Sequence, residues 1–76
     1  MSYEELYKKY EDKKYIIIKI YGLEYVIKEN NSKIIIYPVM YEKNYKEFNN
    51  LIELLNNYTI YNELLIDNMN RMKFVD

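Results

Sequence analysis

The spacing of apolar and polar positions changes twice along the chain of 76 residues. Near the start, apolar side chains recur at positions i, i+3, i+4 and i+7, the spacing of one helical face. Ser2 and Glu5 stand at the spacing of a capping box, in which each side chain satisfies a backbone N–H of the other residue. An amphipathic helix is therefore predicted over residues 2–10, with an apolar stripe made of Tyr3, Leu6, Tyr7 and Tyr10.

The helical spacing is lost in the charged residues 11–14, which are predicted to form a polar connector. From Tyr15 to Pro38 the alternation has a period of two and is rich in β-branched residues, which favours strands. Three strands are predicted, over residues 15–21, 23–29 and 33–37. Pro38 cannot donate a ladder hydrogen bond, so it marks the end of the third strand.

Two short turns are predicted between these strands. Gly22 precedes Leu23, and a type II′ hairpin turn requires a glycine at its first central position. In that register Tyr21 pairs with Glu24 and Ile20 pairs with Tyr25. Residues 30–32, which are Asn-Asn-Ser, close the second hairpin because asparagine tolerates left-handed backbone conformations.

Alternation sorts the strand residues into two faces. The face predicted to lie in the core holds Ile16, Ile18, Ile20, Tyr25 and Ile27, joined by Ile34 and Ile36 if the second turn has an even number of loop residues. The opposite face mixes charged, aliphatic and aromatic side chains, and is predicted to meet solvent or a partner. It holds Tyr15, Ile17, Lys19, Tyr21, Glu24, Val26, Lys28, Ile35 and Tyr37.

Helical spacing returns after Pro38. One helix is predicted to begin at the N-cap Asn44 and to end at Asn56-Asn57, and another to run from Thr59 to Lys73. A strand over residues 58–61 is the less favoured alternative, because no good turn follows it. The prediction is one α+β domain over residues 1–76, in the order α-β-β-β-α-α, with a three-stranded antiparallel sheet covered on one face by helices.

Missing residue types exclude most catalytic chemistry. The chain has no cysteine and no histidine, which removes disulfides, thiol nucleophiles, imidazole catalysis and the usual transition-metal ligands. A single glycine cannot build a phosphate-binding loop. The adjacent acids Glu4-Glu5 and Glu11-Asp12 point about 100° apart on a helix and do not converge. We expect no enzyme activity, no cofactor and no metal.

Net charge and hydropathy further restrict the classes of partner that the chain is expected to bind. Eleven basic and twelve acidic residues give a net charge of −1. Tyrosines and lysines on an open sheet resemble platforms for single-stranded nucleic acid, but no basic stripe stands out, so a small nucleic-acid-binding regulator is the secondary alternative. No apolar stretch approaches the ~18 residues of a membrane span. A cytoplasmic protein of a bacterial host cell, with no membrane contact, is expected.

Binding to another protein is the preferred prediction. Helices on the core side cannot cover the outer face, and exposed apolar patches usually have a partner. The proposed apolar anchors are Tyr15, Ile17, Tyr21, Val26, Ile35 and Tyr37, with Lys19, Lys28 and Glu24 as a polar rim. A second copy of the chain could equally cover this face as a homodimer, and a homo-oligomeric structural protein is a further alternative.

The order of elements resembles that of the small phage-encoded anti-CRISPR inhibitors. The resemblance covers residues 2–22 in pattern, from the capped helix to the end of the first strand, and the rest in element order. It implies a phage or mobile-element inhibitor that blocks a host defence complex, such as a CRISPR-Cas-type nuclease or effector complex, by occlusion. Family members that imitate DNA are strongly acidic, whereas this chain is nearly neutral, so another blocking mode is expected.

Overall fold

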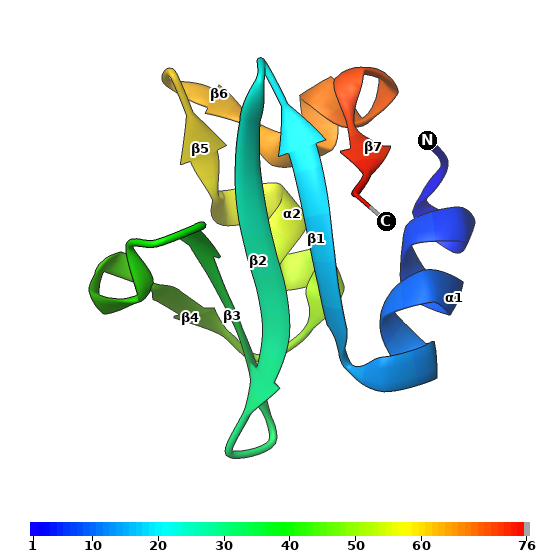
Figure 1. Cartoon of the computed structure of the whole chain (residues 1–76). Coiled ribbons are helices and arrows are strands. Elements are labelled where there is room, and N and C mark those ends of the chain that lie inside the picture. The colour runs from blue at the N-terminus through cyan, green and yellow to red at the C-terminus, as the bar shows by residue number, and fades with distance from the viewer. Residues whose placement is uncertain (76) are drawn as a thin grey trace.

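A computed structural model describes residues 1–75 and shows an α+β architecture (Figure 1). An α-helix comes first, three strands follow, and the second half alternates short strands with helical turns. The elements are α1 (Tyr3–Lys13), β1 (Tyr15–Ile20), β2 (Leu23–Asn30), β3 (Lys33–Pro38), the 3-10 turn η1 (Glu42–Asn44), β4 (Lys46–Phe48), α2 (Leu51–Asn57), β5 (Thr59–Ile60), β6 (Glu63–Leu64), the 3-10 segment η2 (Leu65–Arg71) and β7 (Lys73–Phe74).

Five of the strands form one antiparallel sheet in the order β4-β3-β2-β1-β7, and β5 and β6 form a separate hairpin. The predicted α+β class is confirmed. The predicted order of elements and the count of three strands are wrong, because β4 and β7 extend the sheet at its two edges and the second half contains more than two helices.

The capped first helix is confirmed, but it is longer than predicted. The hydroxyl of Ser2 accepts a hydrogen bond from the backbone N–H of Glu5, and the Glu5 carboxylate accepts one from the N–H of Ser2. The helix continues to Lys13 and ends at Lys14, whose φ of 55° is left-handed. The charged residues 11–13 are thus the last helical turn, and the predicted connector is wrong.

The first hairpin turns one residue earlier than predicted. Tyr21 and Gly22 both have positive φ, 54° and 75°, which defines a type I′ turn rather than type II′. Ile20 therefore pairs with Leu23 instead of Tyr25. The pairing differs from the predicted one by two residues, and a shift of two leaves every side chain on its predicted face.

Two further hairpins use the same kind of turn. Asn31 and Ser32 join β2 to β3 with φ values of 52° and 67°. Tyr61 and Asn62 join β5 to β6 with φ values of 53° and 64°. All three connections are two-residue turns with both residues left-handed, the geometry that matches the natural twist of paired strands.

The predicted alternation in the first strand is confirmed. Ile16, Ile18 and Ile20 are buried, whereas Tyr15 and Lys19 are exposed. The inner face of the sheet packs against α1, α2 and η2 in one core. Its buried members are Leu6, Tyr10, Ile16, Ile18, Ile20, Tyr25, Ile27, Ile34, Ile36, Leu51, Leu54, Leu55, Ile60, Leu65, Met69 and Met72.

The helix predicted from Asn44 is wrong in its first half. Residues Lys46–Phe48 form β4 and pair with β3, whose edge would otherwise be open. The helix α2 begins only at Leu51, where the side chain of Asn50 accepts a hydrogen bond from the N–H of Glu53. Its end at Asn57 agrees with the predicted stop.

The helix predicted from Thr59 to Lys73 is also wrong. The less favoured alternative, a strand near Tyr58 to Tyr61, is what forms, because Tyr61-Asn62 supplies the turn. The chain then enters the 3-10 segment η2 and returns to the sheet as β7. Helical turns and strand β7 thereby close the edge of the sheet next to β1.

Candidate protein-binding surface

The structure divides the predicted outer-face residues into three groups. Tyr15, Lys19, Tyr21 and Glu24 are exposed, and Ile17 and Lys28 are partly buried. Three others retain only small exposed fractions, namely Val26 (4%), Ile35 (3%) and Tyr37 (7%). The prediction that these three side chains are exposed is wrong.

These three residues form a second, smaller core. They pack against one another and against Ile17 and Val39. The ammonium nitrogen of Lys28 lies 5.5 Å from the centroid of the Tyr37 ring, which adds a cation–π contact. Because the neighbouring side chains enclose it, this cluster offers little apolar surface to a partner.

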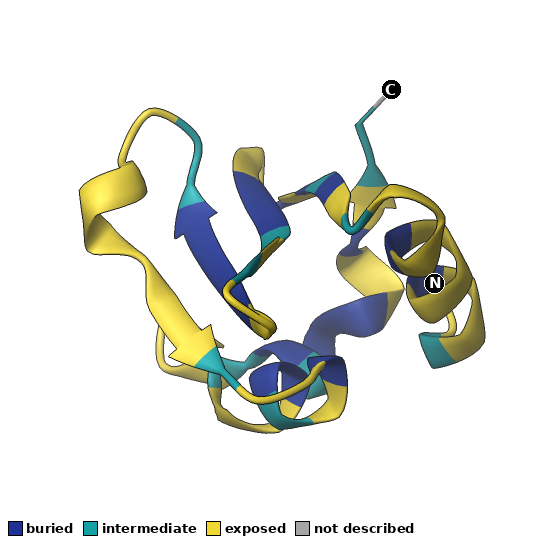
Figure 2. Cartoon of the chain, turned by 90° about the horizontal axis from the view of Figure 1, so that it is seen from below, coloured by how far each residue is buried: buried dark blue, intermediate teal, exposed yellow. Residues whose placement is uncertain are grey.

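Part of this enclosure comes from the connection between β3 and β4, residues 39–45, which we call the strap. The backbone N–H of Val39 donates to the carbonyl oxygen of Glu24 at 3.0 Å. Nζ of Lys28 lies 3.0 Å from Oε2 of Glu42, and this hydrogen bond raises the pKa of Lys28. The strap is thus tied to β2 across β3, and in Figure 2 it forms an exposed arm beside the buried end of β3.

The strap carries exposed apolar side chains, whereas those on the outer face of the sheet are largely buried. Met40 is 90% exposed, and Tyr41 and Tyr45 are also exposed. Leu23, at the start of β2, is another exposed apolar side chain and borders the same hollow as Tyr41. We call this region the strap surface; it consists of Leu23, Glu24, Met40, Tyr41, Lys43, Asn44 and Tyr45.

Met40 occupies a strained backbone position. The N–H of Tyr41 donates to the carbonyl oxygen of Pro38 at 2.9 Å, which closes a turn over residues 38–41. Met40 has a φ of 75° and Val39 does not have a positive φ, so the turn is of type II. Glycine normally fills this position, and another residue there costs about 1–2 kcal/mol. Six other non-glycine residues among residues 1–75 also have a positive φ, at the end of α1 and in the three hairpin turns, so Met40 differs from them in lying outside a hairpin turn with 90% of its side chain exposed.

Two hollows lie on either side of Tyr41 and Asn44. One has a volume of about 720 Å³, with Ile35 among its lining residues next to Lys28 and the strap. The other, of about 640 Å³, lies between the start of β2 and the end of β3 and is lined by Leu23 and Val39. Their partly apolar linings suit the insertion of a side chain from a partner.

The charges on the strap surface are balanced. Glu42 is paired with Lys28, as described above. Within residues 1–75, neither Glu24 nor Lys43 has an ion pair within 4 Å. Glu24 lies opposite Lys19 of β1, so the strap surface carries one acid with a lysine beside it and one base, Lys43, without an ion pair among the described residues.

Tyr21, one of the apolar anchors predicted from the sequence, contacts other residues of its own chain. Its hydroxyl lies 2.7 Å from a carboxylate oxygen of Glu63 and 2.8 Å from the side-chain oxygen of Asn68. Arg71 also donates to that oxygen of Asn68, at 2.7 Å. Asn68 is the one buried polar side chain among the described residues, and this network satisfies it.

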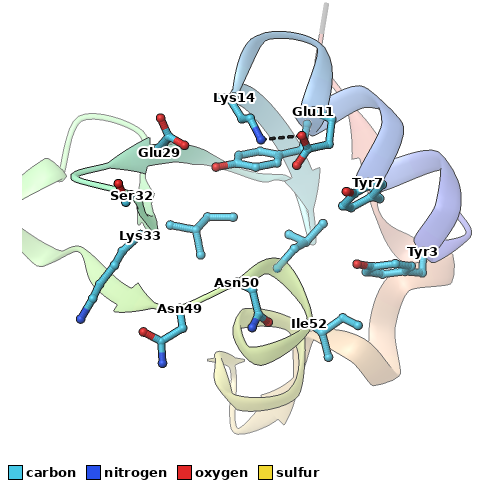
Figure 3. Close-up of a pocket in the computed structure, with 13 residues that line it drawn as sticks. Tyr3, Tyr7, Glu11, Lys14, Glu29, Ser32, Lys33, Asn49, Asn50 and Ile52 are labelled. Carbon is cyan, nitrogen blue, oxygen red and sulfur yellow. Dashed lines mark hydrogen bonds and ion pairs between the residues drawn. The ribbon is translucent and has the colours of Figure 1, made fainter.

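A separate groove of about 440 Å³ lies between α1, the end of the β2–β3 hairpin and the start of α2 (Figure 3). The Tyr3 and Tyr7 rings stack with centroids 5.9 Å apart, and their hydroxyl groups point toward the groove. Lys14 and Glu11 form an ion pair at its edge. Burial, with a further contribution from Glu29, raises the pKa of Tyr10. The groove offers hydroxyl and amide groups together with two acidic and two basic side chains, namely Glu11, Glu29, Lys14 and Lys33.

Sequence reasoning did not identify either the strap surface or the groove. The helical stripe of Tyr3, Tyr7 and Tyr10 was visible, but its position opposite α2 depends on the fold. Within residues 1–75, no cluster of three acidic side chains is placed to hold a metal ion, and no helix is long and apolar enough to cross a membrane.

Comparisons with protein-family models, with curated proteins and with solved structures found no match to this chain.

Proposed function

We propose that this domain is a non-catalytic protein-binding module and that the strap surface makes the contact. The observation that carries the proposal is Met40, an almost fully exposed apolar side chain held in a left-handed backbone conformation. In the isolated chain this conformation is unfavourable, and the side chain gains almost nothing from burial. A partner that buries Met40 provides the missing favourable contact.

The neighbours of Met40 support the same role. Tyrosine and methionine are enriched in protein interfaces, because they bring a large contact area and adapt to irregular surfaces. Tyr41 and Tyr45 flank Met40, and two hollows are available beside Tyr41. Of the residues predicted from sequence, Glu24 and Lys28 keep their proposed role as a polar rim, because both line these hollows.

For the partner we propose the class that the resemblance implies, a CRISPR-Cas-type defence complex of a bacterial host cell, blocked by occlusion by a phage or mobile-element protein. Of the element order on which the resemblance rests, the capped first helix and the three strands are present as α1 to β3, whereas the charged connector and the uninterrupted pair of closing helices are not. The net charge of −1 favours an apolar contact over imitation of DNA.

The test begins with capture of partners from host lysate on the immobilised domain, followed by affinity measurements on the purified complex. Met40→Gly removes the side chain and also relieves the positive φ, so the folded domain is expected to tolerate the substitution. We expect a loss of at least about tenfold in affinity. Ile52→Ala, at an exposed apolar position on α2, is the matched control and is expected to bind normally.

Salt dependence separates this function from nucleic-acid binding. An apolar interface changes little in affinity as salt rises, whereas phosphate contacts make the logarithm of the affinity fall steeply with the logarithm of the salt concentration. Unchanged affinity of the Met40→Gly variant would exclude the strap surface. A steep salt dependence would favour the nucleic-acid alternative.

A further inference from the structure

We infer that, without another partner, the strap surface binds a second copy of this chain in a twofold-symmetric dimer. In such a dimer the same patch faces itself, so it must contain both members of every contact. The strap surface meets this condition in shape and in charge. The inference concerns the purified chain alone and does not depend on the identity of any host partner.

The shape condition is met by Met40 and the hollow beside it. Met40 projects into solvent at the rim of the hollow of about 720 Å³, which the exposed rings of Tyr41 and Tyr45 also line. A projecting apolar group and a hollow with an apolar residue in its lining thus lie side by side on one face. A twofold axis between them places Met40 of each copy in the hollow of the other copy.

The charge condition is met by Glu24 and Lys43. Each lines a hollow of the strap surface, and neither has an ion pair within 4 Å in the described residues 1–75, although Glu24 lies opposite Lys19 of β1. The twofold arrangement pairs Glu24 of one copy with Lys43 of the other, twice. No net charge accumulates in the interface.

The size of the molecule is compatible with such a contact. A stable interface buries about 800 Å² on each partner. The chain exposes 5140 Å², so the dimer would cover roughly a sixth of it. An apolar centre of Met40, Tyr41 and Leu23 within a charged rim has the usual anatomy of an interface.

Sedimentation equilibrium of the purified chain, from micromolar to millimolar concentration, tests the dimer. The natural chain is expected to show a concentration-dependent dimer, and Met40→Gly is expected to weaken it at least about tenfold. Ile52→Ala, outside the strap surface, is expected to dimerise normally. A natural chain that is monomeric throughout overturns the inference, and so does a Met40→Gly variant that dimerises as well as the natural chain.

Charge exchange tests the symmetry. Glu24→Lys alone and Lys43→Glu alone each place two like charges face to face twice, so both variants are expected to be mainly monomeric. Mixed together, they restore two opposite pairs and are expected to form a heterodimer. A mixture that remains monomeric, or single variants that dimerise normally, would overturn the pairing of Glu24 with Lys43. These results are independent of capture from host lysate, so failure of one proposal is distinguishable from failure of the other.

Discussion

Tyr21 and Tyr61 are the first residues of two different hairpin turns, and their rings meet edge to face with centroids 5.5 Å apart. The contact joins the tip of the β1–β2 hairpin to the tip of the β5–β6 hairpin. Only Tyr21 continues into the polar network, through its contacts with Glu63 and Asn68. The two tyrosines therefore have similar backbones and different roles for their hydroxyl groups.

Tyr21→Phe is expected to lower the stability of the domain, because it removes the hydroxyl that contacts Glu63 and leaves Asn68 with fewer partners. Tyr61→Phe is the matched control, since no hydrogen bond of the Tyr61 hydroxyl is present in the described residues, and it is expected to leave stability unchanged. Urea unfolding followed by circular dichroism measures both. Equal effects of the two substitutions would show that the network contributes nothing.

Ile18→Val is expected to lower the free energy of unfolding by about 0.5–1.5 kcal/mol, because it removes a methylene group from a fully buried side chain. Ile17→Val removes the same group at the partly buried neighbouring position and is expected to cost clearly less. Urea unfolding of the two variants compares the faces of β1 directly. A larger cost at Ile17 would contradict the alternation of the strand.

Tyr58 is expected to make the fold sensitive to alkali. Burial raises the pKa of Tyr58 from 10.0 to about 12, with a further contribution from Tyr25. The folded chain then holds this proton more strongly than the unfolded chain, so the stabilisation is complete below pH 10 and is lost as the pH rises towards about 12. Tyr58→Phe is expected to make this fall in stability shallower.

Urea unfolding at a series of pH values measures the effect of Tyr58. Tyr41→Phe, which removes a hydroxyl from an exposed ring, controls for the loss of a tyrosine and is expected to keep the steeper fall. Parallel curves for the natural chain and the Tyr58→Phe variant would show that the Tyr58 hydroxyl titrates alike in the folded and unfolded states.

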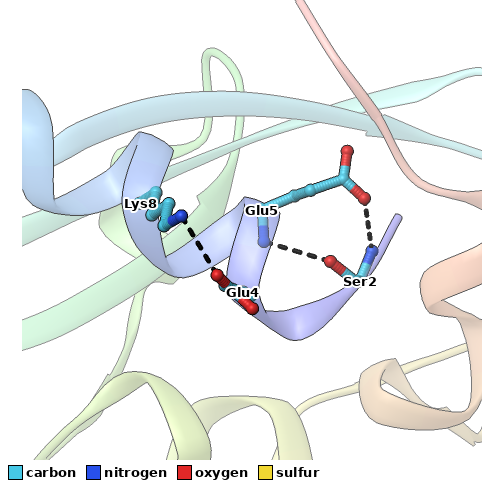
Figure 4. Close-up of polar contacts among 4 residues, drawn as sticks. All are labelled: Ser2, Glu4, Glu5 and Lys8. Carbon is cyan, nitrogen blue, oxygen red and sulfur yellow. Dashed lines mark hydrogen bonds and ion pairs between the residues drawn. The ribbon is translucent and has the colours of Figure 1, made fainter.

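Glu5 is expected to contribute to unfolding by acid. Hydrogen bonds from the backbone and the side chain of Ser2 lower the pKa of Glu5 (Figure 4). The carboxylate therefore stabilises the fold above its ordinary pKa of 4.5, and this contribution is lost as the pH falls through the lowered folded-state pKa. Glu5→Gln can keep the hydrogen bond to Ser2 but cannot titrate, so its stability is expected to fall less steeply in acid.

Glu4→Gln is the control for the Glu5 experiment, because it changes the charge of the same helical turn at the residue that pairs with Lys8 (Figure 4). It is expected to keep more of the natural dependence on acid than Glu5→Gln. A Glu5→Gln variant with the natural dependence of stability on acid would contradict the link to Ser2.

Ser2→Ala is expected to lower the free energy of unfolding by about 1 kcal/mol at neutral pH, the usual value for loss of an N-cap.

The features that sequence alone could predict are those set by local spacing. The capping pair Ser2 and Glu5 marks the start of α1, and alternation separates Ile16 and Ile18 from Ile17. These assignments are correct although the first turn was predicted one residue too late. The observed pairing of β1 with β2 differs from the predicted pairing by two residues, so each side chain stays on its predicted face. The inner face of the sheet was therefore predictable without the correct register.

The features that sequence could not predict depend on distant contacts. Tyr45 and Phe48 have helical spacing with Leu51. Residues 46–48 nevertheless pair with the edge of β3 and form β4. Tyr61 gives no turn signal, because tyrosine is unfavourable in the left-handed conformation it adopts there. Burial of Val26 and Ile35 follows from a second cluster that alternation cannot reveal, so the surface that we propose for partner contact lies on the strap and not on the sheet.

The strap has one residue facing inward and its neighbours facing outward. Val39 packs into the smaller core, whereas Met40 and Tyr41 contribute little to any core. A mutation at Met40 or Tyr41 is therefore expected to disturb the fold less than a mutation at Val39. Under the proposed function, such a division would let the sequence at the outward positions vary with the partner, while the packing of Val39 restricts what can replace it.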